Sequence, residues 1–503
     1  MNPSKTPPAI PVEHNIQSAL EWLAEANRRS SPEHAEQLHR QMQLVRAAPL
    51  PTSQRSKILD LFYTHTARLV ETEIPDLQQI TMPISRRLRL RVRVLQNLLE
   101  TLAQDYLNTL SDLFDPQLTQ PHRPPAEALR HIIQCLVWNI RVSQLIAAPT
   151  PVGLWLELHT ILGTIRRLGC EKSLTDEQQS SMEHLYLSAI LIAIAQPTSF
   201  NSRELEFIAS CLDSLSHDIH LSESPPLDSN GAFWIDPQVD FPAHAIVRRP
   251  PPPDIHAWFF SCKDFAGKIS GLLKLLVKGT PAASIGLPAM ADTVSGQNIL
   301  RRLVTRWGDP GKRRFNRRRQ SYRARMAFGL NHLWQLFKTP ETPPPFSEWM
   351  VINESPDGYA IMHMSGEASE LAVGDIVAIQ PGKDAAKSES PWYICIVRWA
   401  VSENPEHIEL GLQLLAAKAM AASIGQAHGK PAQTINALLI PETPPLRNTP
   451  AVIVESGKLS STSEKIIVLL EKENLEIREV RPTHLDEQTS LIDVFSVEPD
   501  ETN

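Results

Sequence analysis

The fold of the C-terminal part of this chain is decided by EWMVINES at 348–355, GDIVAIQ at 374–380, WYICIVRWA at 392–400 and HIELGLQLL at 407–415. In these runs the apolar residues recur with a period of about two, which is typical of β-strands. Turn-forming Pro, Gly and Asp separate the runs, and the pattern continues in AVIVES, KIIVLLE, LEIREV and DVFSVE. Many short strands joined by turns predict a small antiparallel barrel.

The sequence before this part has the helical period instead. Between Leu95 and Tyr106, apolar residues fall at positions 95, 98, 99, 102 and 106, on one stripe of a helix with 3.6 residues per turn. Proline-containing breaks at 49–51, 121–125 and 149–151 separate such segments. Helices joined by short connectors of this kind predict an antiparallel bundle or an irregular solenoid.

These two patterns predict an α+β multidomain protein. We expect an all-helical region over 1–310, interrupted by a loop at 221–253. A basic arm and a β-barrel are expected over 311–432. A β-rich C-terminal extension that ends in an acidic tail is expected over 433–503.

The composition narrows the class of protein. The chain has 503 residues with 49 Lys and Arg against 56 Asp and Glu, and this mild acidity argues against a dedicated nucleic-acid-binding protein. Its five cysteines stand apart without a CxxC pair, as expected in a reducing compartment. The N-terminus has no apolar signal segment, and no apolar run approaches the ~20 residues that span a bilayer. We therefore expect a cytoplasmic protein that does not bind membranes.

The sequence contains no catalytic or metal-binding signature. The motifs HExxH, GxSxG and GxGxxG do not occur, and Cys and His are not clustered at zinc-ligand spacing. Gly308-Asp-Pro-Gly-Lys312 resembles a phosphate loop but lacks the GxxxxGK[ST] spacing. We therefore predict a protein that is not an enzyme and that holds no metal.

Two short motifs flank the change from helices to strands. The segment 301–325 has eleven Lys and Arg against one acid, and it ends in Arg319-Gln-Ser-Tyr-Arg323, an RxxxR. The second motif, Asn353-Glu-Ser-Pro-Asp-Gly358, is an NxSxxG that directly follows the apolar core of the first run. The RxxxR spacing also occurs at positions 313/317 and 314/318, so the spacing by itself does not single out one pair of arginines.

The residue types in these motifs suit an anionic ligand that carries guanine. An Arg guanidinium can bind a phosphate, or the O6 and N7 edge of guanine, through two parallel hydrogen bonds, and a good Arg–guanine pair discriminates by about 1–3 kcal/mol. Asn353 offers amide donors and an acceptor, and Ser355 offers a hydroxyl. Gly358 allows a positive φ and removes a side chain where a ligand or the turn backbone comes close. The alternatives are a solvated basic face for the first motif and an ordinary hairpin turn for the second.

Together with the later strand HIELGLQLL, the two motifs resemble those of PilZ domains. The resemblance implies a six-stranded β-barrel that binds the bacterial second messenger cyclic di-GMP. It implies that Arg319 and Arg323 lie on an arm before the barrel and grip guanine and phosphate. It also implies that Asn353, Ser355 and Gly358 hold the ligand from a turn on the barrel surface.

Two further residues near the motifs bear on this interpretation. Glu354 places a negative charge inside the turn, where the family usually has an apolar residue. Arg398, next to Trp399, is interpreted as a salt bridge at the rim rather than a ligand contact.

The resulting hypothesis is a non-enzymatic signalling effector. Cyclic di-GMP would order a mobile arm, 311–325, and thereby re-orient a helical region that binds a protein partner. Two alternatives remain open. One is a nucleic-acid-binding protein that uses the Arg-rich segment 301–325, whose binding would weaken with salt. The other is a ligand-independent helical scaffold with a degenerate barrel.

Overall fold

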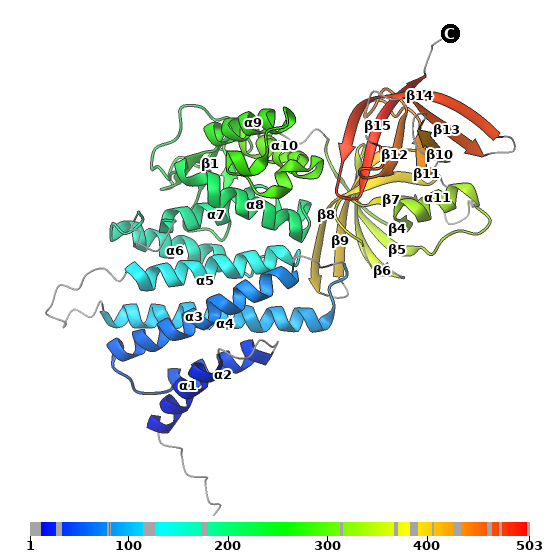
Figure 1. The fold of residues 1–503 in the computed structure, drawn as a ribbon. Helices are drawn as coiled ribbons and strands as arrows, with labels where there is room; N and C mark the ends of the chain where they lie inside the picture. The colour runs from blue at the N-terminus through cyan, green and yellow to red at the C-terminus, as the bar shows by residue number, and fades with distance from the viewer. Residues whose placement is uncertain are drawn as a thin grey trace, which may run out of the picture.

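A helical region and two β-barrels make up the molecule, and the barrels lie together at one end (Figure 1). This computed structural model describes residues 12–26, 33–77, 80, 82–113, 126–172, 180–311, 315–366, 371–382, 391–404, 407–426, 434–459, 465–471 and 475–499. The α+β multidomain fold expected from the sequence is confirmed.

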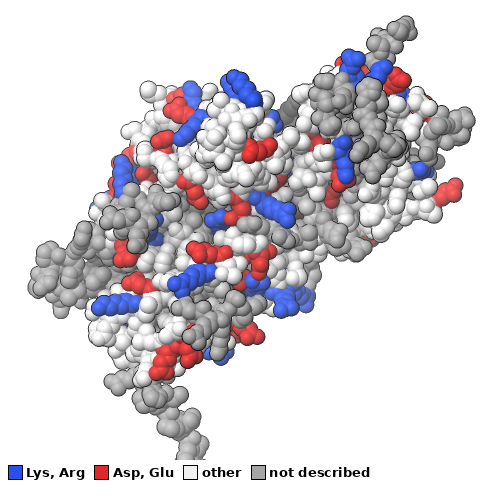
Figure 2. Space-filling view, viewed as in Figure 1, with Lys and Arg blue, Asp and Glu red and all other residues white. Residues whose placement is uncertain are grey.

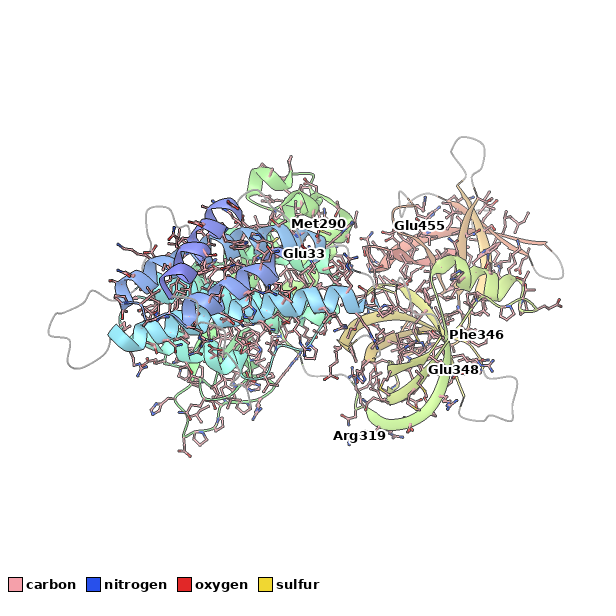
Figure 3. All side chains as sticks on the ribbon, turned by 90° about the horizontal axis from the view of Figure 1, so that it is seen from below. Glu33, Met290, Arg319, Phe346, Glu348 and Glu455 are labelled. Carbon is pink, nitrogen blue, oxygen red and sulfur yellow. The ribbon has the colours of Figure 1, made fainter. Side chains whose placement is uncertain are left out.

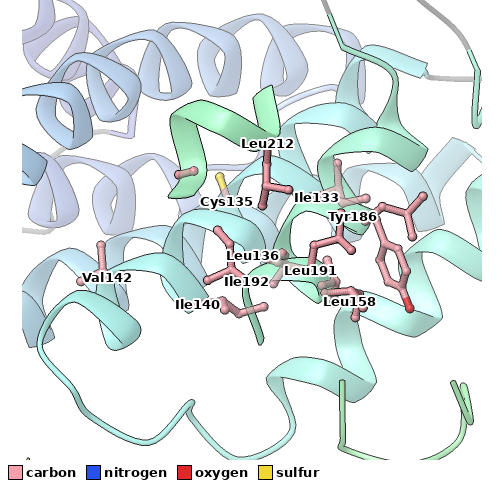
Figure 4. Packing of buried hydrophobic residues seen from close by; sticks show 14 of the residues in the cluster. Ile133, Cys135, Leu136, Ile140, Val142, Leu158, Tyr186, Leu191, Ile192 and Leu212 are labelled. Carbon is pink, nitrogen blue, oxygen red and sulfur yellow. The ribbon is translucent and has the colours of Figure 1, made fainter. Parts of the chain in front are cut away.

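The helices stack in layers around one continuous apolar core (Figure 1). Their ends follow ordinary capping chemistry: Asn201 and Glu204 form a capping box at the start of α8, which satisfies backbone N–H groups of the first turn. Figure 4 shows how apolar side chains of α5, α6, α7 and α8 interlock in this core. The helices are α1 (Val12–Ala26), α2 (Glu33–Arg46), α3 (Thr52–Leu77), α4 (Arg86–Leu113), α5 (Ala126–Leu145), α6 (Leu154–Arg167), α7 (Met182–Ile194), α8 (Ser202–Leu215), α9 (Lys263–Val277) and α10 (Val294–Gly308).

The expectation that residues 1–310 are all-helical is wrong in one segment. A small antiparallel sheet of order β2-β1-β3 is formed by β1 (Ala232–Ile235), β2 (His244–Ala245) and β3 (Trp258–Ser261). β1 and β2 lie within the predicted loop at 221–253. Phe233 stacks on Phe260 of β3, and this cross-strand aromatic pair stabilises the sheet. The many Pro and Gly residues around β1 and β2 predicted a loop instead.

The first barrel contains the four runs that decided the sequence analysis. It closes in the order β4-β5-β6-β9-β8-β7, with antiparallel pairs throughout. Inward side chains such as Trp349, Ile361 and Val397 fill it. Its strands are β4 (Arg318–Phe328), β5 (Ser347–Ser355), β6 (Gly358–Ser365), β7 (Ile376–Pro381), β8 (Tyr393–Asn404) and β9 (His407–Ala416).

The basic arm expected over 311–325 is in large part a strand. Residues 318–325 belong to β4 and pair with β5, so the expectation of a mobile arm does not hold for them. Residues 312–314 lie outside the described residues. Backbone hydrogen bonds to β5 and β7 offset the mutual repulsion of the arginines, which point outward into solvent.

The β-rich C-terminal extension is a second closed barrel, of order β10-β11-β12-β15-β14-β13. The two barrels have the same topology, since each strand of the first barrel corresponds to the strand numbered six higher in the second. The second barrel begins with β10 at Met420, directly after β9 and residues 417–419. The boundary between the two β-regions therefore lies before Met420 and not between residues 432 and 433 as expected. Its strands are β10 (Met420–Gln426), β11 (Ile435–Ile440), β12 (Ala451–Glu455), β13 (Ile466–Glu471), β14 (Leu475–Gln488) and β15 (Ile492–Pro499).

The two barrels share an apolar core. Helix α11 (Leu330–Lys338), between β4 and β5, packs its Leu333 and Leu336 into this core. Ile376 and Ile396 of the first barrel join Ile453 and Val494 of the second barrel there. Trp334 on α11 also donates from Nε1 to the carbonyl of Ala422, 2.8 Å away, so the barrels form one continuously packed body.

Contacts between the helical region and the barrels are mostly polar. The backbone N–H of Ser402 donates to the carbonyl of Ala147, 2.9 Å away, and Nη2 of Arg89 donates to the carbonyl of Ser402 at the same distance. Asn298 of α10 donates to the carbonyl of Gln488 in the second barrel. Within the described ranges, no helix combines the length and the apolar character needed to cross a bilayer.

Candidate functional site

A pocket of about 370 Å³ lies beside the turn between β5 and β6. The NxSxxG residues Asn353, Ser355 and Gly358 line one side of it. Arg398 and Trp399 of β8 line the pocket as well, as do residues 411–413 of β9. The structure therefore brings the three turn residues of the predicted site together at one surface depression.

The turn itself is held by its own side chains. Ser355 pairs with Gly358 across the hairpin, and its Oγ donates to Oδ1 of Asp357 over 2.6 Å. The carbonyl of Asp357 accepts from the backbone N–H of Leu414, 2.8 Å away. Ser355 thus has a fixed hydroxyl oxygen at the pocket, and this oxygen can still accept a hydrogen bond from a ligand.

Gly358 is required by a close approach of two strands. A Cβ at this position would lie 1.9 Å from the carbonyl oxygen of Leu412 on β9, far inside contact distance. β6 and β9 are paired at this point, Gly358 opposite Gln413, so the missing side chain lets the pocket floor close. The sequence suggested either a positive φ or a close approach at Gly358, and the structure shows the close approach, to the backbone of β9.

The arginines of the predicted RxxxR do not line this pocket. Arg319 is paired with Asn353 in the β4–β5 ladder, and Figure 3 shows it at an outer end of the first barrel. Arg323 is paired with Met350, five residues before Ser355, which is about 16 Å along a strand. Its side chain is 70% exposed, and Nη1 lies 3.8 Å from Oε2 of Glu348.

Among the described residues of the basic segment, Arg317 is the arginine that lines this pocket. It lies directly before β4, and Phe315 lines the pocket beside it. Arg317 is the second member of an RxxxR pair at 313/317, whose first member lies outside the described residues. In the sequence, Arg317 differs from Arg319 and Arg323 in that it lies immediately before the first strand of the barrel.

A second hollow, of about 510 Å³, lies on the other side of the same turn. Phe315, Glu354 and Ser355 border both hollows, and Arg318 borders the second. The turn therefore forms a ridge between two depressions, and the residues just before β4 run along both.

Glu354 is directed to a neighbouring tyrosine. The hydroxyl of Tyr322 donates to its Oε2 over 3.2 Å. Burial, followed by the charge of Glu354, raises the pKa of Tyr322 above its usual value, so this hydroxyl keeps its proton at all physiological pH values. The negative charge inside the turn thus has a hydrogen-bond donor from β4.

Arg398 combines a salt bridge with a place in the pocket wall. Its Nε donates to Oε1 of Gln413 over 2.6 Å, and its Nη2 forms an ion pair with Glu487 of β14. Trp399 lies flat across Gly411, where a Cβ would come within 1.7 Å of the indole Nε1. The expected rim salt bridge is present, and Arg398 also lines the pocket beside Trp399.

No cluster of three or more His, Cys, Asp or Glu among the described residues is arranged to hold a metal ion. The chemistry available at the pocket is that of hydrogen-bond donors and acceptors, guanidinium groups, aromatic faces and the two carboxylates of Glu354 and Asp357.

Comparisons with known proteins relate this architecture to a described family of receptors. Residues 17–226 match the family described as the N-terminal domain of the cyclic-di-GMP receptor FimW, and residues 334–421 match its middle PilZ domain. A protein of Pseudomonas aeruginosa named cyclic-di-GMP receptor FimW is 21% identical, over 84% of this chain and 80% of that protein. The two matched ranges together span more than half of the chain, and the second lies in the first barrel and its helix α11. The chain therefore belongs to the PilZ-domain family, with the helical N-terminal domain and the middle PilZ barrel that the FimW proteins have.

Proposed function

We propose that this protein is a cytoplasmic, non-enzymatic effector of bacterial signalling that binds cyclic di-GMP at the β5–β6 turn. The observation that carries the proposal is the convergence of Asn353, Ser355, Gly358 and Arg317 on one pocket of a PilZ barrel. The name of the Pseudomonas aeruginosa relative, a cyclic-di-GMP receptor, supports the same ligand.

The shape of the site supports a ligand with two separated bases. A cyclic dinucleotide carries two guanines and two phosphates, and the turn here separates two hollows. Phe315 borders both hollows and offers an aromatic face for stacking, while Arg317 and Arg318 offer guanidinium groups. Asn353 and Ser355 supply neutral hydrogen-bond groups on the ridge.

The proposed output passes through the helical region to a protein partner. Residues 309–317 connect α10 to β4, and the end of this connection borders the pocket. A ligand that binds Phe315 and Arg317 changes the constraint on this connection, and with it the orientation of α10 relative to the barrels. The free energy available for that change is the difference in ligand affinity between the two arrangements.

We expect Arg317→Gln to weaken binding of cyclic di-GMP by about 10- to 100-fold, because it removes charge-assisted hydrogen bonds to a phosphate or guanine. Isothermal titration of the full-length chain measures this. Arg325→Gln is the matched control, since Arg325 is an exposed β4 arginine that lies over the Phe346 ring, and it should bind like the wild type. A wild-type chain that gives no binding heat would refute the proposed function.

The predicted pair Arg319 and Arg323 is tested in the same titration. If the arm arginines are those two, then Arg319→Gln and Arg323→Gln lose affinity while Arg317→Gln does not. The pocket lining favours the opposite result. The nucleic-acid alternative predicts salt-sensitive RNA binding that all exposed arginines of β4 share. On the face of the molecule in Figure 2, basic and acidic side chains are interspersed rather than gathered in a basic patch.

A further inference from the structure

The pocket wall formed by β8 and β9 contains an arginine that is held by side chains of two neighbouring strands. Arg398 on β8 is anchored through Nε to Gln413 of the neighbouring strand, and Gln413 lines the same pocket. Its Nη2 is paired with Glu487, which belongs to the second barrel. The side chain is 28% exposed, so the guanidinium is held in place and still accessible from the pocket.

The second barrel also contributes directly to this wall. Leu446, in the loop between β11 and β12, lines the pocket. Arg447 organises that loop by donating to the carbonyls of Pro441, at 2.6 Å, and Thr449, at 2.8 Å. The position of Leu446 is therefore defined by contacts inside the second barrel, and the pocket is a composite of both barrels.

Positive charge accumulates around Arg398. Arg302 and Arg306 of α10 hold the carbonyls of Ser199 and Ala195, and both lie over the ring of Phe200. Burial is the main cause that lowers the pKa of Arg306 to about 9, and the charges of Arg302 and Arg398 contribute. Glu487 offsets part of this repulsion, since it also acts on Arg302. An anion at Arg398 would offset it in the same way.

We propose that Arg398 is a further ligand-binding residue of the cyclic di-GMP site, and that Glu487 of the second barrel competes with the ligand's phosphate for its guanidinium. This inference rests on the proposed function and adds a contact outside the two sequence motifs. Ligand and carboxylate are both anions that suit the planar fork of an arginine. The ligand phosphate and the Glu487 carboxylate bind the same guanidinium. The factor by which the ligand weakens the Arg398–Glu487 pair therefore equals the factor by which that pair weakens ligand binding.

The test is isothermal titration of the full-length chain and its variants with cyclic di-GMP. Arg398→Gln should weaken binding by about tenfold or more, because a charge-assisted hydrogen bond to phosphate is lost. Glu487→Gln keeps a hydrogen-bond acceptor for Arg398 but removes the competing charge, so it should tighten binding by about fivefold. Glu479→Gln, on the same strand and paired with Lys465 at 3.0 Å, is the matched control and should leave the affinity unchanged.

The double variant separates competition from a general effect of charge. In the Arg398→Gln background, Glu487→Gln should no longer tighten binding, since its effect acts through Arg398. If Arg398→Gln binds like the wild type, or Glu487→Gln tightens binding equally in both backgrounds, this inference is wrong while the proposed function stands. If the wild-type chain does not bind cyclic di-GMP at all, the proposed function fails and this inference with it.

Discussion

Replacing Gly358 with alanine is expected to destabilise the first barrel by about 3 kcal/mol and to abolish ligand binding. The added Cβ would lie 1.9 Å from the carbonyl oxygen of Leu412, and this neighbour is backbone that cannot rotate away. β6 and β9 must then separate at Gly358, which breaks their ladder and moves Ser355 at the turn. Thermal unfolding of the full-length chain should show a midpoint lower by about 5 °C or more.

The control for this substitution is Gly425→Ala in the second barrel. Gly425 is paired with Ile467 in a comparable antiparallel ladder, and nothing lies within 4 Å of the position of its Cβ. We expect this variant to melt and to bind like the wild type, because no atom has to move. A Gly358→Ala variant with the same melting midpoint as Gly425→Ala would show that β6 and β9 are not packed as closely as described.

Asp375→Asn is expected to stabilise the protein at alkaline pH by about 4 kcal/mol, the largest gain that we foresee. Asp375 is 8% exposed at the start of β7, and its Oδ1 accepts from the backbone N–H of Ile376 over 2.8 Å. Burial is the main cause that raises the pKa of this carboxyl to about 7. An asparagine keeps the acceptor and has no charge to bury.

The sign of the pH dependence follows from the raised pKa. The neutral carboxyl is favoured in the folded state, so its contribution to stability is complete below about pH 4 and is lost as the pH rises through about 7. The gain from Asp375→Asn should therefore be less than half as large at pH 5 as at pH 8. Unfolding midpoints at both pH values measure it, with the exposed Asp254→Asn as a control that changes neither. An equal gain at both pH values would mean that burial does not raise the pKa of the Asp375 carboxyl.

The strands could be predicted because their pattern is local. Alternation in EWMVINES reports one buried face, and β5 lies where this run lies. WYICIVRWA also forms a strand, β8, but it is buried on both faces, because Cys395 and Val397 fill the first barrel while Ile394 and Ile396 join the core shared by the two barrels. Closure of the second barrel could not be predicted, since it depends on pairing β10 with β13 across about forty residues of chain. The small sheet was missed for the same reason: β1 finds its partner β3 only after a proline-rich segment.

The sequence could predict that the turn residues lie together, but it could not predict which arginine borders the pocket. Asn353, Ser355 and Gly358 lie within six consecutive residues, so a hairpin necessarily brings them together. Several arginines share the RxxxR spacing, and only the start of β4 at Arg318 decides that Arg317 borders the pocket while Arg323 faces solvent. The salt-bridge partner of Arg398, Glu487, lies 89 positions further along the chain, so the sequence could not identify it.

The shared apolar core of the two barrels has a mechanical consequence. Separating the barrels would expose α11 and the buried isoleucines around it, whereas the contacts to the helical region are mainly a few hydrogen bonds, at Ser402, Asn298 and Met82. Any large rotation within the molecule therefore has its hinge between the helices and the barrel pair. The backbone crosses that hinge once, at residues 309–317, and the last residues of this crossing line the pocket. A ligand bound to Phe315 and Arg317, as proposed, would therefore contact the hinge segment directly.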